Sequence, residues 1–375
     1  MNILLVNYEF PPIGGGGGHA MECLLREYAK RKGLSVTLLT SKDEGDCLME
    51  YPERNIQIMR IPIHKKDLNH WRSREVLEWL WRAWPYYHRL VMCKWFDCAH
   101  AFFGFPSGWL CRRTAKQLPY LISLRGSDVP GNNSALWWRY GVLRPVFKTI
   151  WKHASGIVAC SEGLRAQAPR FMPGQSIDVI PNGVDTVRFH PAERVGPRMR
   201  LLTVSRMAAA KRLPVLLTAV ETLIRAGCPV RWTIVNGGGS SEDLKALIHQ
   251  NYLHHHVTVM DHIPAEQMPE VYHNHDLYIS ASTQEGMSNA MLEAMASGLP
   301  IVTTRCPGAD ELVRDNGLIV ESEGLASAIR YVLCNPQKWG IASRIRAEAF
   351  VWSSVADQYI HLYQSIVEER HVREV

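Results

Sequence analysis

The sequence lacks any run of about 20 apolar residues, the length that a membrane-spanning helix requires. Its first ten residues, MNILLVNYEF, have no basic start, and their apolar run is too short for a signal peptide. We therefore expect a cytoplasmic protein. Any membrane contact would be peripheral, on the inner face of the cytoplasmic membrane.

The sequence also lacks a Cys-x-x-Cys pair, and its nine cysteines are an odd number. This pattern favours buried thiols in a reducing compartment over disulfides or a zinc site. Three adjacent histidines, His254 to His256, are the one visible candidate metal cluster. Adjacent side chains point in different directions, so we expect no metal there.

No long basic run and no nucleic-acid reading module is present, and the net charge of +6 is modest for 375 residues. We therefore expect no nucleic-acid partner. With 46% hydrophobic and 21% charged residues, the composition is that of an ordinary globular protein. The length suggests two domains.

Short apolar runs alternate with helical patterns in the first half of the chain, which predicts βαβ units and a parallel sheet. Their continuous hydrophobicity is typical of strands covered on both faces. The predicted strands are 3–8, 36–39, 56–62, 120–124, 156–160 and 177–181, with a helix over 20–31.

The stretch PAERVGPRM (191–199) has no apolar periodicity and is predicted to be a linker. After it the alternation restarts, with predicted strands at 200–205, 230–236, 257–260, 277–280 and 300–304 and helices over 213–226, 241–250 and 288–297. We expect two doubly wound, Rossmann-like α/β domains, residues 1–190 and 191–353, facing each other across a cleft. The cleft is the expected ligand site, because open α/β sheets bind ligands at the carboxyl ends of their strands.

A glycine run, Gly14 to Gly18, follows the first strand and opens into a helix. Glycines allow close approach of a ligand, and a helix N-terminus attracts anions, so a phosphate or sugar-phosphate fits this loop. A flexible loop without a ligand is the alternative. The loop is not a dinucleotide fingerprint, because no acidic residue clearly ends the second strand. It is not a P-loop, because His19 follows the run.

Two cations, Arg206 and Lys211, follow the first strand of the second half. At the carboxyl end of the sheet, two cations five residues apart are suited to neutralising a diphosphate. A solvated helix start is the alternative.

Two glutamates frame the stretch EGMSNAMLE, residues 285–293. Gly286 lies at the expected strand-to-helix turn, Ser288 is an expected N-cap and Gly298 an expected C-cap. Free amides at such a turn bind phosphate oxygens. Glu285 precedes the helix and Glu293 lies inside it, so we expect them at different parts of one elongated ligand, not paired across one bond.

At this point the sequence resembles the retaining glycosyltransferases of family 4, which have the two-domain GT-B fold. The resemblance covers nearly the whole chain. It is carried by NYEFPPIGGGGG, VIPNGVDTVRFHP (179–191), VSRMAAAKR, EGMSNAMLEAMASGLPIV and FVWSSVADQYIHLY (350–363), of which the glutamate pair followed by AMASGLP is the most specific.

The resemblance implies a role for each matching position. Arg206 and Lys211 correspond to the basic pair on the donor diphosphate, Glu285 to the donor-sugar contact and Glu293 to the ribose contact. Further donor-binding positions are Gly15, Gly16, Gly17, Ile263, Gly286, Met287, Ser288, Asn289 and Ala290. Arg206, Lys211 and Glu285 are the catalytic candidates. The resemblance also implies a final helix, residues 354–375, that crosses back to the first domain.

Four positions depart from the family pattern. Where many members have His-x-His, this chain has His100 and Phe102, and where many have His-Gly it has Arg125-Gly126. We expect Arg125 and Asp128 to line the acceptor side of the cleft, together with His100, Phe102 and Asn182; a purely structural turn is the alternative. Arg212 stands where glycine is common, and Asn236 where an acidic or glycine-rich turn is usual.

The expected activity is transfer of a sugar, with retention, from a nucleotide-diphosphate sugar to a hydroxyl acceptor. A UDP-sugar is favoured over a GDP-sugar. No Asp-x-Asp metal motif is present, so we expect neither a metal nor another cofactor. Residues 71–96 combine Trp, Tyr and Arg, which suggests a membrane-interface helix and a lipid-linked or membrane-associated glycan acceptor. An ordinary core helix with a basic face is the alternative.

Other classes remain open from the residues alone. A soluble glycosyltransferase with a small acceptor and a non-catalytic nucleotide-sugar binder are the main alternatives. A phosphorylase would need a cofactor-bearing lysine, and an epimerase would need no acceptor. A dinucleotide oxidoreductase is disfavoured by the missing fingerprint.

Overall fold

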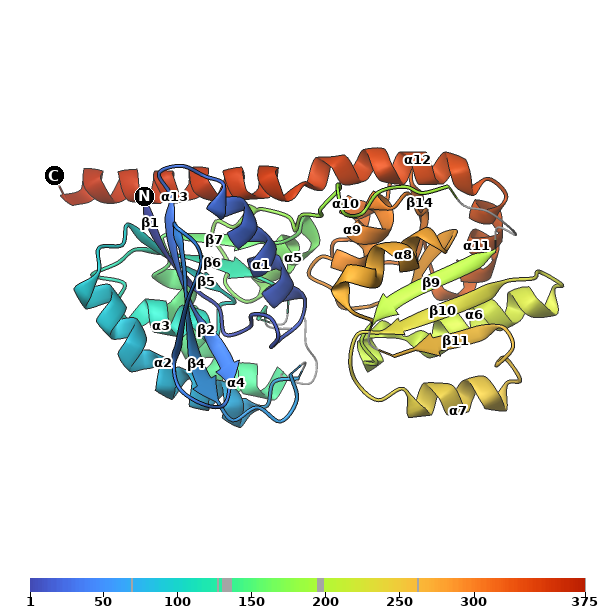
Figure 1. The fold of residues 1–375 in the computed structure, drawn as a ribbon, viewed down its shortest axis with the longest axis horizontal. Coiled ribbons are helices and arrows are strands. Elements are labelled where there is room, and N and C mark those ends of the chain that lie inside the picture. The colour runs from blue at the N-terminus through green and yellow to red at the C-terminus, as the bar shows by residue number, and fades with distance from the viewer. Residues whose placement is uncertain (69, 127, 130–136, 194–198, 262, 375) are drawn as a thin grey trace. The chain divides into compact units, whose positions relative to one another are not determined.

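Figure 1 shows a computed structural model of the chain, which describes residues 1–68, 70–126, 128–129, 137–193, 199–261 and 263–374. The side chains of 137–142, 373 and 374 are not described. The chain forms two compact units: unit 1 is Met1–Asn182 with Trp352–Val375, and unit 2 is Gly183–Val351. The first segment of unit 1 therefore ends at Asn182, before the domain boundary expected at residue 190. Part of the predicted linker, 194–198, lies outside the described residues.

The sheet of unit 1 has the strand order β3-β4-β2-β1-β5-β6-β7-β8. Every pairing in it is parallel except that of β3 with β4. The bounds are β1 Asn2–Val6, β2 Ser35–Asp43, β3 Leu48–Glu53, β4 Ile56–Ile63, β5 Cys98–Phe102, β6 Tyr120–Leu124, β7 Gly156–Ala159 and β8 Asp178–Val179. The six strands predicted for this half are present, and β3 and β5 are additions to that set.

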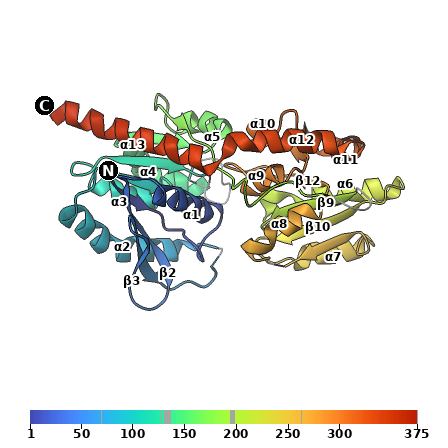
Figure 2. The same ribbon diagram turned by 45° about the horizontal axis from the view of Figure 1, so that its top comes forward.

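The central strands of unit 1 are apolar along their length because helices cover both faces of the sheet. Ile3 to Val6 and the whole of β5 and β6 are buried. On one side, α1 packs beside α13, as both views show (Figures 1 and 2). α2, α3 and α4 form a second row of neighbouring helices. The bounds are α1 Gly16–Ala29, α2 Ser73–Cys93, α3 Ser107–Arg113, α4 Trp137–Lys152, α5 Glu162–Gln167 and α13 Trp352–Glu374.

The C-terminal helix α13 belongs to unit 1, as the family resemblance implied. Its Asp357 pairs with Arg31 at the end of α1, at 2.8 Å, and the Tyr363 hydroxyl lies 3.1 Å from the Tyr28 hydroxyl of α1. The chain therefore returns to its first unit after completing the second.

The sheet of unit 2 is wholly parallel, with the order β11-β10-β9-β12-β13-β14. Its bounds are β9 Arg200–Ser205, β10 Arg231–Asn236, β11 Val257–Met260, β12 Leu277–Ser280, β13 Ile301–Thr304 and β14 Gly317–Val320. The helices are α6 Leu213–Arg225, α7 Glu242–Gln250, α8 Met268–His273, α9 Asn289–Ala296, α10 Ala309–Leu312, α11 Leu325–Leu333 and α12 Pro336–Ala347. The predicted strands and helices of this half are all present, and β14 is an addition.

Both sheets are doubly wound, which confirms the predicted fold class. In unit 1 the chain begins at β1, extends to one edge, and returns to the other side of β1 through β5. In unit 2 the same reversal falls between β9 and β12. Ligands of open α/β sheets bind at the carboxyl ends of the strands on either side of such a reversal. Ligands are therefore expected at the loops after β1, β5, β9 and β12.

No helix in the described part of the chain is long and apolar enough to cross a membrane. Within the region 71–96, residues Ser73–Cys93 form a single helix, α2, that continues through Pro85.

Candidate functional site

Lys211 and Glu285 meet at the strand reversal of unit 2. Lys211 follows β9 and Glu285 follows β12, and the Lys211 ammonium donates a hydrogen bond to a Glu285 carboxylate oxygen. Each side chain is 16% exposed, so the ion pair is largely shielded but reachable. The structure thus brings together two residues that lie 74 positions apart in the sequence.

The backbone holds the two loops of this pair together. The Thr283 amide donates to the Ala210 carbonyl at 2.9 Å. Arg212, directly after Lys211, adopts φ +48° and ψ +41°, a left-handed conformation that favours glycine. This conformation explains why glycine is common at the position. The Arg212 guanidinium donates to the Ser322 hydroxyl at 2.9 Å, which helps to hold the residue there.

The stretch EGMSNAMLE forms the predicted turn into α9. The Ser288 hydroxyl accepts a hydrogen bond from the Met291 amide at 3.3 Å, so Ser288 is the N-cap. Gly298 ends the helix with φ +71°. Because Ser288 is neutral, the positive end of the α9 dipole is not cancelled by its own cap.

Glu293 lies in α9 and belongs to a different contact from Glu285. Its carboxylate accepts a hydrogen bond from the Tyr272 hydroxyl at 2.8 Å. Tyr272 is fully buried in α8, and burial, together with the negative charge of Glu293, raises its pKa well above the usual range. The hydroxyl therefore stays protonated and orients the Glu293 carboxylate. The two glutamates are separate, as the sequence analysis expected.

Arg206 is exposed, at the turn after β9. A second turn supports this loop: the Met207 amide donates to the Gly238 carbonyl at 2.7 Å. The Asn236 side chain closes that turn, accepting from the Gly238 amide at 2.8 Å and donating to the Gly239 carbonyl at 2.9 Å. Asn236 thus shapes a glycine turn beside the cation.

Charged groups of the unit 2 site act on the buried residues around them. Burial and then the Glu285 carboxylate raise the pKa of Tyr278. The same two causes, opposed by Lys211, raise the pKa of Cys306 to about 12, so this buried thiol stays protonated and unreactive. Ile263, a predicted donor-binding residue, lies in the loop after β11, which is the edge strand of this sheet.

The glycine loop of unit 1 contains an acceptor that the sequence analysis missed. The Glu9 carboxylate accepts a hydrogen bond from the Gly15 amide at 3.3 Å, at the N-terminus of α1. A Cβ at Gly14 would lie 2.6 Å from the Glu9 Cβ, and Gly14 has φ +103°, so glycine is required there. Glu9 therefore supplies negative charge where a bound phosphate was predicted.

Phe103 forms the other side of this loop. It follows β5 with φ +73°, which is a strained conformation for a bulky residue and is of the kind found at functional sites. A Cβ at Gly17 would lie 2.6 Å from the Phe103 ring. The Tyr8 and Phe103 ring centroids are 5.1 Å apart, so aromatic packing stabilises the loop after β1 against the loop after β5.

Arg125 follows β6 and contacts three neutral groups. Its guanidinium donates to the Asn182 side-chain oxygen and lies over the Phe102 ring, 4.9 Å from the centroid. Its charge also acts on the nearby Tyr359 hydroxyl, opposing the increase in pKa that burial causes there. Arg125 and Asn182 are partly and almost fully buried, respectively, and Phe102 is fully buried.

Asp128 caps the turn that carries Arg125. Its carboxylate accepts from the backbone amides of Gly104, Arg125 and Gly126 at 2.8, 2.8 and 3.0 Å. Asp128 is 5% exposed, and burial raises its pKa although the three amides act in the opposite direction. The carboxylate thus connects the loops after β5 and β6.

His100 is fully buried in β5. One ring nitrogen hydrogen-bonds the Tyr363 hydroxyl at 2.6 Å and the other the Ser123 hydroxyl at 2.7 Å. Burial, followed by the charge of Arg125, lowers the His100 pKa to about 3. The neutral imidazole connects β5 and β6 with α13 and does not face an open surface. The sequence offered no signal for its partner Tyr363, which lies 263 positions further along the chain.

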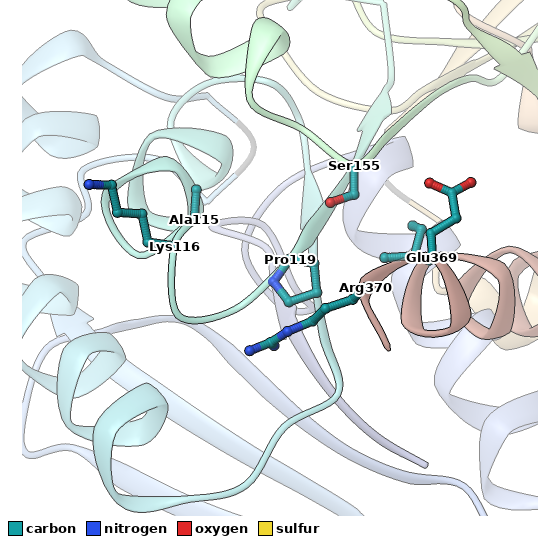
Figure 3. Close-up of a pocket in the computed structure, with 7 residues that line it drawn as sticks. Ala115, Lys116, Pro119, Ser155, Glu369 and Arg370 are labelled. Carbon is teal, nitrogen blue, oxygen red and sulfur yellow. The ribbon is translucent and has the colours of Figure 1, made fainter. Parts of the chain in front are cut away.

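A surface pocket of unit 1 lies at the other end of its strands (Figure 3). Pro119 and Ser155, which line it, directly precede β6 and β7, so this pocket opens at the amino edge of the sheet. Arg370 and Glu369 of α13 form its far wall. The pocket is therefore distinct from the loops described above. Among the described residues, no group of three or more His, Cys, Asp or Glu is arranged to hold a metal.

Comparison with known proteins agrees with this geometry. Residues 13–188 match the family model described as Glycosyltransferase Family 4, and residues 198–335 match the one described as Glycosyl transferases group 1. The chain is 29% identical over 209 residues to a GDP-mannose-dependent alpha-(1-6)-phosphatidylinositol monomannoside mannosyltransferase of Mycobacterium tuberculosis, covering 50% of this chain and 54% of that protein. It thus spans about half the length of that relative. It is 23% identical to an alpha-maltose-1-phosphate synthase of Mycolicibacterium smegmatis, and the match covers 98% of this chain and 100% of that protein.

Solved structures show the same fold. Sucrose-phosphate synthase from Thermosynechococcus elongatus superposes with a TM-score of 0.83 at 20% identity, covering 98% of this chain and 100% of that one. Anabaena Alr3699/HepE in complex with UDP-glucose has a TM-score of 0.71 at 18% identity, and the match covers 97% of this chain and 100% of that one. The architecture is the GT-B fold that the sequence resemblance implied. The chain belongs to the group 1, family 4 glycosyltransferases.

Proposed function

We propose that this protein transfers a sugar, with retention of anomeric configuration and without a metal, from a nucleotide-diphosphate sugar to a hydroxyl acceptor. The observation that carries the proposal is the Lys211–Glu285 pair, placed with the N-terminus of α9 at the strand reversal of unit 2. A departing nucleotide diphosphate gains negative charge as the glycosidic bond breaks. Fixed positive groups that stabilise this charge are often the largest single source of catalysis.

Lys211 is suited to this task despite its pairing with Glu285. An ammonium has three N–H donors, and one of them is directed to Glu285. The remaining donors, the Arg206 guanidinium and the positive end of the α9 dipole supply positive charge to the diphosphate. Glu285 holds the ammonium in place and contacts the donor sugar. Glu293, oriented by Tyr272, accepts hydrogen bonds from the ribose hydroxyls.

The donor is tested by binding and by hydrolysis. We expect the full-length protein to bind UDP and UDP-glucose more tightly than GDP and GDP-mannose in calorimetry, and to release UDP slowly with EDTA present. The names of the relatives include both nucleotides, so both belong in the screen. Absence of binding to every nucleotide sugar tried would contradict the proposal. Binding without turnover under any acceptor condition would favour a non-catalytic sugar-nucleotide binder.

For the acceptor we propose a lipid-linked or membrane-associated glycan, with the protein bound peripherally at the membrane through unit 1. The support is the outer face of α2, where Leu77, Trp81 and Met92 are 61%, 76% and 59% exposed, and Trp95 beyond its end is 83% exposed. The exposed cations Arg74, Arg89 and Lys94 accompany this apolar stripe. Aromatic residues with neighbouring cations suit an anionic membrane interface.

A flotation assay with vesicles containing anionic lipid tests the membrane contact. We expect the protein to float with the vesicles, and the double variant Trp81→Ser with Trp95→Ser to remain at the bottom. Tyr331→Ser is the matched control, because Tyr331 is an exposed aromatic of unit 2. If the unaltered protein stays in solution, a soluble enzyme with a small acceptor becomes the better proposal.

A further inference from the structure

Arg125 is held at the carboxyl edge of the unit 1 sheet by groups that carry no charge. Its guanidinium contacts the Asn182 amide oxygen, the Phe102 ring and the Tyr359 hydroxyl. These contacts restrict the side chain to one position. They do not neutralise it.

Among the side chains that the structure describes, no carboxylate forms an ion pair with Arg125. The acid nearest in sequence, Asp128, uses its oxygens on the amides of Gly104, Arg125 and Gly126. A partly buried arginine is normally paired with an acid, because removing an unpaired charge from water is costly. Arg125 thus retains an uncompensated positive charge.

The surroundings of Arg125 respond to that charge. His100 stays neutral, first because it is buried and then because Arg125 is positive. Burial raises the pKa of Tyr359, and Arg125 acts against that increase. Neither neighbour supplies negative charge, so the positive potential remains available to a ligand.

Arg125 also stands where a ligand is expected. It directly follows β6, which pairs with β5, and β5 pairs with β1 at the strand reversal. The carboxyl edge of these strands is the ligand-binding edge of an open α/β sheet. The other anion-attracting feature there, the N-terminus of α1, already has the Glu9 carboxylate at the Gly15 amide.

We propose that Arg125 is a specificity-determining residue that binds an anionic group, a phosphate or a carboxylate, on the acceptor. The planar fork of its guanidinium N–H groups matches either anion by paired hydrogen bonds. This inference rests on the proposed function, since it assigns the acceptor to unit 1. It deepens that function by requiring an acceptor that carries a negative charge.

Binding of small sugars to the full-length protein tests this. The probes are glucose 6-phosphate, glucuronate, glucose and inorganic phosphate, titrated by saturation-transfer NMR at constant ionic strength with saturating UDP, which occupies the donor phosphate site. We expect both anionic sugars to bind more tightly than glucose. Arg125→Gln should weaken their binding about tenfold, the value of one charge-assisted contact.

Arg125→Lys and Arg170→Gln are the control variants. Arg125→Lys keeps the charge without the fork and should bind with intermediate affinity. Arg170 is an exposed cation of unit 1, and its removal should have no effect. If Arg125→Gln fails to fold, as judged by its thermal unfolding, Arg125→Lys carries the comparison.

Three results would overturn the inference: unchanged affinities in Arg125→Gln, equal binding of glucose and the anionic sugars, or inorganic phosphate binding as tightly as glucose 6-phosphate, which would indicate a simple ion site. Failure of UDP to bind the unaltered protein would instead contradict the proposed function. In that case the Arg125 comparison is made without nucleotide in Lys211→Ala, so the two failures are separable.

Discussion

The carboxyl edges of the two sheets have the same architecture and opposite arrangements of charge. In unit 2 the largely buried cation at this edge, Lys211, is paired with the Glu285 carboxylate. The helix α9 begins at the neutral cap Ser288. In unit 1 the cation Arg125 contacts neutral groups, and the helix α1 begins at an amide bonded to the Glu9 carboxylate.

This difference separates two ways of receiving an anion. Unit 2 offers the start of a helix together with a lysine that a carboxylate positions, which suits a diphosphate that spreads charge over several oxygens. Unit 1 offers one planar guanidinium, which suits a single compact anion. Doubly wound sheets therefore determine where ligands bind, while a few loop residues determine which charge they bind.

The largest expected effect comes from removing the paired cation of unit 2. We expect Lys211→Ala to lower the rate of sugar transfer or donor hydrolysis by about a hundredfold or more, because the leaving diphosphate loses its fixed positive charge. Lys245→Ala is the control, since Lys245 is a more exposed lysine of the same unit. Near-normal turnover in folded Lys211→Ala would contradict the catalytic role of Lys211.

The next largest effect is expected for Glu293, whose carboxylate is oriented by Tyr272 of α8. We expect Glu293→Ala to weaken donor binding about tenfold through loss of the ribose contact. Calorimetry with UDP measures this, and Glu266→Ala, at an exposed acid, is the control. Because the Tyr272 hydroxyl would keep only its longer hydrogen bond to the Ala290 carbonyl, at 3.2 Å, stability should also fall by about 1 kcal/mol. An unaltered UDP affinity would show that Glu293 serves only to satisfy Tyr272.

A smaller effect is expected from acid on unit 1. The folded pKa of His100, about 3, lies below the unfolded value of about 6.5, so the unfolded state takes up the proton first. Stability is unaffected by His100 above about pH 6.5 and decreases as the pH falls towards 3, with a loss of about 2 kcal/mol by pH 5. Urea unfolding between pH 5 and 7.5 measures it. In His100→Gln the dependence should flatten, and an equally steep dependence there would assign it to other groups.

The smallest effect is expected at the start of α1. Glu9→Gln keeps an oxygen for the Gly15 amide but removes the negative charge beside the helix dipole, which should cost about 0.5 kcal/mol. The comparison also predicts that this variant accepts an anion at the loop more readily, seen as stronger binding of inorganic phosphate. A variant with no change in either quantity would show that the charge of Glu9 is immaterial.

The sequence was sufficient for most of the fold and for half of the site. Continuous apolar runs located most strands within two residues, and the turn chemistry of EGMSNAMLE located Ser288 and Gly298, because such signals are local in the chain. The separation of Glu285 from Glu293 followed from helix geometry alone. Strand β5 was missing from the predicted set because CAHAF interrupts its apolar residues with a histidine.

The remaining parts depend on contacts distant in sequence, which no local pattern records. The partner of Lys211 lies after another strand, and one of the two hydrogen-bond partners of His100, Tyr363, lies in the last helix. Asp128 is an example of a residue whose burial decides its role: a carboxylate that accepts three amides serves the turn, whatever its position in the sequence suggests. Glu9 was visible in NYEFPP, but only the fold brings it to the Gly15 amide.

The position of α13 has a consequence for synthesis of the chain. Unit 2 is one continuous segment, Gly183–Val351, whereas unit 1 consists of two segments that enclose it in sequence. Domains fold largely as units while the chain emerges from the ribosome. Unit 2 can therefore complete its core while unit 1 still lacks Tyr359 and Tyr363, the partners of Ser123 and His100. Unit 1 starts to be translated before unit 2 and is completed after it, so Ser123 and His100 lack their tyrosine partners until α13 has been made.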